Sequence, residues 1–87
     1  MIHLRFFGHI RSSLGSEEMD VQRESMSVDD LFGLLLSGAP AGMAHGFSKY
    51  NTLLVVNDGE VVSPSAQRGM VIRDGDSVTL VPFSHGG

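Results

Sequence analysis

The sequence predicts a small α+β domain in which a mixed sheet of four to five strands packs against one main helix. Three observations predict it. Apolar residues alternate with polar ones near the N-terminus, as in a strand with one buried face. Residues 27–38 carry a capped helical pattern, and residues 77–82 form another strand-like run. The chain of 87 residues has room for one core only.

The N-terminal part predicts a β-hairpin. Residues 2–7 alternate in polarity and are expected to form the first strand. Residues 8–15 break this alternation, and we expect a loop there. Alternation returns at residues 19–22, which predicts a second strand next to the first.

The main helix is predicted by its cap and by its apolar spacing. Ser27 is a typical N-cap residue, and Asp29 and Asp30 complement the positive end of the helix dipole. Gly38 and then Pro40 are a typical stop signal. The apolar residues at helical spacing are Val28, Leu31, Phe32 and Leu35. This helix therefore has one face to bury.

The middle of the chain predicts a long loop and a second hairpin. Residues 38–51 hold three glycines and a proline and are expected to form the loop. Residues 53–56 are apolar throughout, which predicts a strand that is apolar on both faces. Asn57-Asp58-Gly59 then predicts a tight turn into a short strand at residues 60–62.

The C-terminal part completes the fold. Residues 63–69 are expected to be irregular, and Asp74-Gly75-Asp76 predicts a turn that leads into the last strand, residues 77–82. The expected order is strand, strand, helix, strand, short strand, strand. This is the order of the ubiquitin-like β-grasp, in which the first and last strands are parallel neighbours in the centre of the sheet.

Composition excludes several classes of protein. The net charge is −4 and the six basic residues are dispersed, so we expect no nucleic-acid partner. No apolar run is long enough to span a membrane, and no signal peptide is visible, so we expect a cytoplasmic protein without a membrane partner. The chain has no cysteine, and its four histidines lack the spacing of metal ligands, so no metal site is expected.

The sequence ends in Gly86-Gly87, only two residues after the last strand and Phe83. A diglycine stalk can enter a narrow channel because glycine has no Cβ. We expect a domain over residues 1–83 and a flexible tail over residues 84–87 that presents the terminal carboxylate. The alternative is a frayed end without function.

Three segments together resemble the small subunit of molybdopterin synthase and the related ThiS-like sulfur carriers. Residues 1–11 hold a strand ending in two phenylalanines, then a small residue, and then an arginine three positions on. Residues 55–62 resemble the valine-asparagine-glycine-glutamate hairpin of that family, with one residue inserted. Residues 72–82 resemble its Asp-Gly-Asp turn and final strand, followed by the terminal diglycine.

The resemblance implies a sulfur carrier that is not itself an enzyme. An E1-like adenylyltransferase of the MoeB/ThiF type would use ATP to adenylate Gly87, and a persulfide donor would convert it to a thiocarboxylate. Gly86 would enter the narrow active-site channel of that enzyme together with Gly87. The large subunit of molybdopterin synthase (MoaE type) would receive the sulfur for molybdopterin in molybdenum cofactor biosynthesis. No bound cofactor is expected, and the chain lacks a phosphate-binding loop for ATP of its own.

The resemblance also implies a docking surface. If the even-numbered residues of the first strand face the helix, Phe7 faces outward, with Val81, Phe83 and one of Leu54 or Val56. The alternative is that residues 39–50 cover these side chains. Two further sets are candidate partner contacts: Arg11, which matches the arginine of the family, and the spacer Ser84 and His85. The alternatives are a surface ion pair for Arg11 and a solvated spacer at His85.

Three functions remain open. The first is the molybdopterin-type carrier, and a carrier of the thiamine, cysteine or tRNA-thiolation pathways differs from it only in its partners. The second is a ubiquitin-like modifier conjugated through Gly87 to lysines of target proteins. The third is a binding module whose tail is inert.

Overall fold

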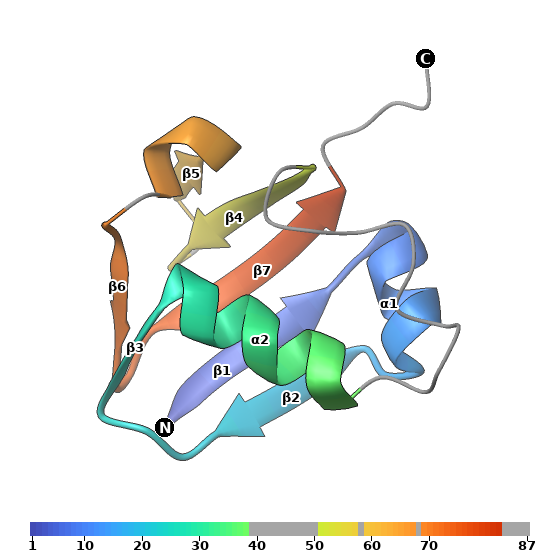
Figure 1. Cartoon of the computed structure of the whole chain (residues 1–87), viewed down its shortest axis with the longest axis horizontal. Coiled ribbons are helices and arrows are strands. Elements are labelled where there is room, and N and C mark those ends of the chain that lie inside the picture. Colours follow the sequence, from blue (N-terminus) through green and yellow to red (C-terminus); the bar gives the residue numbers. More distant parts are fainter. Residues whose placement is uncertain (39–50, 58, 68, 83–87) are drawn as a thin grey trace.

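The computed structural model describes residues 1–38, 51–57, 59–67 and 69–82 (Figure 1). The elements are β1 (Ile2–Phe6), α1 (Gly8–Leu14), β2 (Glu18–Val21), β3 (Ser25–Ser27), α2 (Val28–Gly38), β4 (Thr52–Val56), β5 (Glu60–Val62), the 3₁₀ helix η1 (Pro64–Gln67), β6 (Val71–Arg73) and β7 (Ser77–Pro82). Within these residues no helix has the length and apolarity needed to cross a bilayer.

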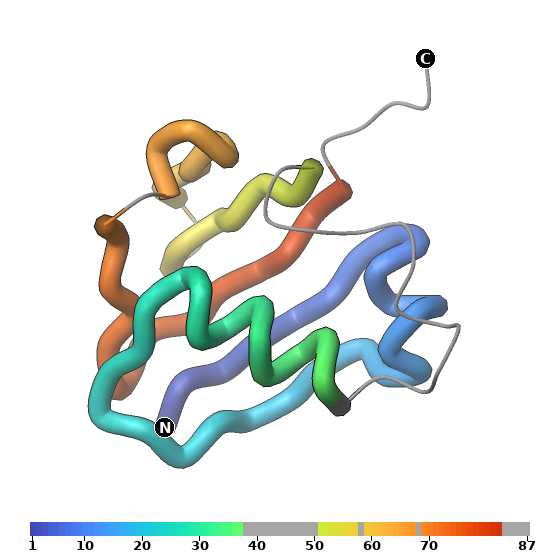
Figure 2. The backbone as a smooth tube through the Cα atoms, in the orientation of Figure 1, coloured from blue at the N-terminus to red at the C-terminus, as the bar shows by residue number. Residues whose placement is uncertain are grey.

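The five-stranded sheet has the order β2-β1-β7-β4-β5, and α2 lies across one face of it (Figure 1). Strand β1 runs antiparallel to β2 and parallel to β7, so the predicted hairpin and the predicted central parallel pair are both confirmed. Strands β4 and β7 are antiparallel. The tube in Figure 2 shows β1 and β7 side by side although they come from opposite ends of the chain.

Residues 8–15 are not the loop that the sequence predicts, because Gly8–Leu14 forms the helix α1. The helix buries Ile10 and Ser13 and ends at Gly15, whose left-handed backbone lets its N–H donate to the carbonyl of Arg11. No side chain caps its N-terminus. A helix of two turns held by two buried residues gives too weak a periodic signal to be recognised.

The second difference from prediction is a separate two-stranded sheet. Strands β3 and β6 pair antiparallel, with Met26 opposite Ile72, and both side chains are buried. Each strand has three residues and buries only its central side chain. Alternation over three residues is too short to distinguish a strand from a turn.

The predicted main helix is confirmed. The N–H of Asp30 donates to the hydroxyl oxygen of Ser27 at 3.0 Å, which satisfies one free amide of the first turn. The core lies between α2 and the sheet: Ile2, Leu4, Phe6, Ile10, Val21, Met26, Val28, Leu31, Phe32, Leu35, Leu54, Val56, Val62, Ile72, Val78 and Leu80. The even-numbered residues of β1 therefore face the helix, as the alternation predicts.

We expect Leu80→Ala to lower the free energy of unfolding by about 2–5 kcal/mol, because Leu80 is fully buried on the central strand β7 and its truncation leaves a cavity. Val61→Thr is the control, since the Val61 side chain is exposed, and it should change stability by about 0.5 kcal/mol or less. Urea unfolding followed by circular dichroism measures both. Equal effects of the two substitutions would contradict this account of the core.

Candidate docking site at the end of strand β7

The face of the sheet opposite α2 is here called the outer face. Its side chains alternate with the core residues along each strand. Among the described residues it includes His3 and Arg5 on β1, Ser77, Thr79 and Val81 on β7, Leu53 and Val55 on β4, and Val61 on β5, together with Phe7 directly after β1. All of these side chains are half-buried or exposed. Apolar side chains therefore gather on a sheet surface that the described part of the core does not cover.

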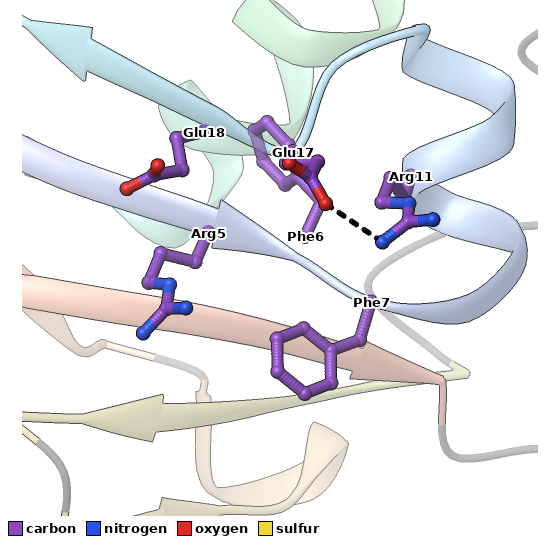
Figure 3. Close-up of a pocket in the computed structure, with 6 residues that line it drawn as sticks. All are labelled: Arg5, Phe6, Phe7, Arg11, Glu17 and Glu18. Atoms are coloured by element: carbon purple, nitrogen blue, oxygen red, sulfur yellow. Dashed lines mark hydrogen bonds and ion pairs between the residues drawn. The ribbon is translucent and has the colours of Figure 1, made fainter.

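Phe7 stands where the last strand ends. Its N–H donates to the carbonyl of Leu80 at 3.1 Å, which continues the β1–β7 pairing past the end of β1. Its ring extends over β7 on the same side of the sheet as Arg5 (Figure 3). The side chain is 49% exposed, although phenylalanine is usually buried. An aromatic ring held in solvent by a rigid strand is well placed to bind a partner.

Gly8 lies against Pro82, the last described residue of β7. Its φ is +60°, and a Cβ built there would come within 2.7 Å of the Pro82 Cγ. Only glycine therefore allows α1 to start this close to the end of β7. The contact fixes the position of Pro82, and hence the point from which residues 83–87 follow.

Charged side chains surround a pocket of about 230 Å³ beside Phe7 (Figure 3). Arg11 of α1 donates to Glu17 at 2.9 Å, and both side chains are more than half exposed. Screening by solvent makes such an exposed ion pair a weak contributor to stability. The pair holds the cation of Arg11 at the rim of the pocket.

His3 lies between two carboxylates of the neighbouring strand. Its Nδ1 is 2.6 Å from Asp20 and its Nε2 is 2.8 Å from Glu18. The hydrogen bond to Asp20 is the main cause that raises the pKa of His3 above 6.5; desolvation opposes it, and the hydrogen bond to Glu18 adds to it. The imidazolium form donates from both ring nitrogens and so binds β1 to β2.

The model of the ThiS family matches residues 4–87, which is nearly the whole sequence. This chain belongs to the ThiS family. Among solved structures, the crystal structure of SAMP1 from Haloferax volcanii superposes with a TM-score of 0.60 at 20% sequence identity, covering 99% of this chain and 98% of that one. No curated protein matches the sequence. The likeness to SAMP1 confirms the ubiquitin-like β-grasp, an α+β fold.

Membership of the ThiS family makes the chain a small ubiquitin-like carrier, and proteins of this family generally work with E1-like activating enzymes. The structure brings three of the predicted contact residues to one end of the sheet: Phe7, Val81 and, on α1, Arg11. Phe83, Ser84, His85, Gly86 and Gly87 lie outside the described residues, as does the segment 39–50 that was expected as an alternative cover.

The prediction that Leu54 or Val56 faces outward is wrong. Both are buried in the core, because Leu54 pairs with Leu80 and Val56 with Val78, two core residues of β7. Leu53 takes the outward position instead, opposite Val81. The run 53–56 is apolar on both faces, so sequence alone could not assign its two sides.

Sequence reasoning missed Arg5 and the His3 cluster. Arg5 precedes Phe7 by two residues and therefore shares its face, a signal that the alternation already contained. The two carboxylates next to His3 come from β2, and their pairing depends on a hairpin register that only the structure provides.

We expect Gly8→Ala to lower the free energy of unfolding more than Gly15→Ala does. Both glycines have a positive φ, so strain costs about 1–3 kcal/mol at each. Only the new methyl group at residue 8 meets Pro82, whereas nothing lies within 4 Å of one at residue 15. Urea unfolding gives the difference, and amide NMR shifts of Val81 should move in Gly8→Ala only. Equal losses of stability would show that the approach of Gly8 to Pro82 is unimportant.

We expect Asp20→Asn to lower the pKa of His3 toward 6.5, and Glu18→Gln to lower it less. NMR titration of the imidazole measures both. Because the pKa of His3 is raised in the folded state, its stabilising effect is complete below 6.5 and is lost as the pH rises through the raised pKa. The thermal midpoint of the wild type should fall as the pH rises from 6.5 through the raised pKa of His3. His3→Gln should remove this part of the pH dependence. An unchanged pH profile in His3→Gln would contradict the assignment.

Proposed function

We propose that this protein is the sulfur carrier subunit of a molybdopterin synthase, with a thiocarboxylate formed at Gly87. The observation that carries the proposal is the position of the end of β7. This central strand of a ThiS-family fold ends next to the exposed ring of Phe7, and the tail follows it directly. The family match also extends to Gly87. A rigid docking surface and a reactive terminus are thereby joined by a few residues.

The chemistry uses the terminal carboxylate and no side chain of this chain. One oxygen of the Gly87 carboxylate attacks the α-phosphorus of ATP on an E1-like enzyme, and pyrophosphate leaves. The terminal sulfur of a protein persulfide then attacks the acyl carbon, and AMP leaves. A second thiol cleaves the sulfur–sulfur bond, which yields the Gly87 thiocarboxylate and a disulfide. Activation divides one difficult substitution into easier steps.

Reach is consistent with this function. Residues 84–87, fully extended, would span about 13 Å at ~3.3 Å per residue, which is enough to enter a buried active site. The docked domain and the reacting atom could therefore occupy different regions of the partner. The large subunit would likewise bind the domain at one region and take the sulfur from Gly87 at another.

The molybdopterin branch is supported by residues at the end of the sheet where β1 meets α1. Phe6-Phe7 followed by Arg11 matches the opening of the small subunit of molybdopterin synthase. The side chains of these residues have different tasks: Phe6 is in the core, Phe7 is on the outer face, and Arg11 is at the rim of the pocket. Carriers of the thiamine, cysteine or tRNA-thiolation pathways would use the same Gly87 chemistry with other partners.

A second candidate function is protein modification, in which the activated Gly87 forms an isopeptide bond with a lysine of a target. SAMP1 from Haloferax volcanii shares the fold of this chain, and this fold is compatible with both functions. Both functions begin with the same adenylate, so they differ only in what attacks the acyl carbon.

We expect the intact mass of the protein to rise by one sulfur-for-oxygen exchange when it is incubated with the E1-like enzyme, ATP and a persulfide donor. The matched control is a variant without Gly87, which keeps the domain but should gain no sulfur. A wild-type mass that never changes under these conditions would refute the carrier function.

A second measurement separates the branches. The added sulfur should be lost when a cyclic pyranopterin phosphate and the large subunit are supplied, with formation of molybdopterin. Retention of the sulfur there, together with conjugates of higher mass in cell extract that need Gly87, would instead establish a modifier.

A further inference from the structure

Arg5 is an exposed cation on the outer face, on the strand next to the edge strand β2. It forms no ion pair and no side-chain hydrogen bond with any described residue, although acidic residues are close to it in the register. Across the sheet its row reads Glu18, Arg5, Thr79, Val55 and Val61. Arg5 therefore stands at the border between the acidic edge strand β2 and the apolar part of the face.

The acidic neighbours of Arg5 are already engaged. Glu18 lies directly opposite Arg5 on β2, but its carboxylate is hydrogen-bonded to His3 at 2.8 Å. Asp20 is bonded to the other nitrogen of His3 at 2.6 Å, and Glu17 accepts from Arg11 at 2.9 Å. In Figure 3 the guanidinium of Arg5 extends away from Glu18 and over β7, the strand that the ring of Phe7 also overlies.

This arrangement determines what kind of surface can cover the face. A partner that packs on Phe7, Leu53 and Val81 removes water from Arg5 as well, because Arg5 projects from the same face. A guanidinium that loses its water without receiving an acceptor is strongly unfavourable. A carboxylate restores the lost hydrogen bonds with the planar two-pronged geometry that arginine favours.

We propose that Arg5 is the charged anchor of the outer face, and that the E1-like activating enzyme presents an aspartate or glutamate to it within an otherwise apolar contact. His3 supports this by holding Glu18 away from Arg5, which leaves the guanidinium available. The proposal rests on the proposed function for the identity of the partner. It adds to that function a specificity-determining charge on this chain and the chemistry of the group that meets it.

The first test compares Arg5→Gln with Arg23→Gln for binding to the E1-like enzyme encoded by the same genome. Arg23 is exposed beyond the far end of β2, so both variants lose one charge, but only one of them loses it from the outer face. We expect Arg5→Gln to weaken binding about tenfold, Arg5→Lys to weaken it less, and Arg23→Gln to have little effect. Thermal unfolding of each variant verifies that it is folded.

Salt gives a second readout. The affinity of the wild type should fall more steeply with ionic strength than that of Arg5→Gln, because the variant has lost the charge pair. Equal affinities of Arg5→Gln and Arg23→Gln would overturn the proposal. Tighter binding by Arg5→Gln would overturn it too, since it would mean that the partner presents a cation or an apolar group.

The role of His3 has its own test. In His3→Ala the released Glu18 can pair with Arg5, so binding should weaken. The double variant His3→Ala, Glu18→Gln should recover most of the affinity, because no competing carboxylate remains opposite Arg5. If the double variant binds no better than His3→Ala, His3 acts only through the stability of the hairpin, and this part of the proposal fails.

Binding and charging are measured separately, so the two proposals can fail independently. Association with the E1-like enzyme without ATP requires no reaction at Gly87, whereas the mass change requires it. A wild type that binds through Arg5 but never gains sulfur would refute the carrier function alone. A wild type that is charged normally while Arg5→Gln and Arg23→Gln bind equally would refute the anchor alone.

Discussion

Strands β1 and β7 run parallel in the centre of the sheet, although almost the whole chain separates them in sequence. Two parallel strands cannot be joined by a short turn, so the chain between β1 and β7 must cross over, and here it forms β2, α2, β4 and β5 on the way. The same pairing aligns Leu4 with Val78 and Phe6 with Leu80, residues that are central to the core. It also brings the ring of Phe7 to the end of β7. The stability of the core and the position of the end of β7 thus have one common origin.

The polar chemistry of the outer face is organised around the edge strand β2. An exposed edge strand offers unpaired backbone groups to other chains, and charged residues such as Glu18 and Asp20 discourage this. His3 on β1 is hydrogen-bonded to both of these carboxylates, and Arg11 donates a hydrogen bond to Glu17. These contacts are largely exposed, so their value for global stability is small. Their main consequence is the distribution of charge, which is acidic at β2 and cationic beside Phe7.

Much of this fold could be predicted from the sequence because the local signals in its long elements agree with the place of each element in the fold. The helix α2 has a cap, an apolar face and a stop, and β7 follows a clear turn. The features that could not be predicted belong to elements that are either short or apolar on both faces. Helix α1 buries two residues, and β3 and β6 bury one each. The two sides of β4 are both apolar, so the burial of Leu54 rather than Leu53 became visible only through its pairing with β7.

The candidate site has two parts, the diglycine tail and the outer face. Sequence alone revealed the tail, whereas the outer face could be assigned in full only from the structure, and this difference bears on how a carrier would select its pathway. Glycine presents no side chain, so a partner can recognise Gly86-Gly87 only as backbone and terminal carboxylate. Carriers that end in the same diglycine must then be distinguished elsewhere. On this chain the groups that could distinguish one partner from another lie on the outer face. They are an aromatic ring, aliphatic side chains and the cation of Arg5, on or next to three neighbouring strands. Apolar area supplies affinity with little selectivity, whereas a charge that must be matched on docking penalises every surface that lacks the complementary group. Under the proposed function, selection among pathways would depend on the charge pattern of the sheet, and the tail would contribute the reaction.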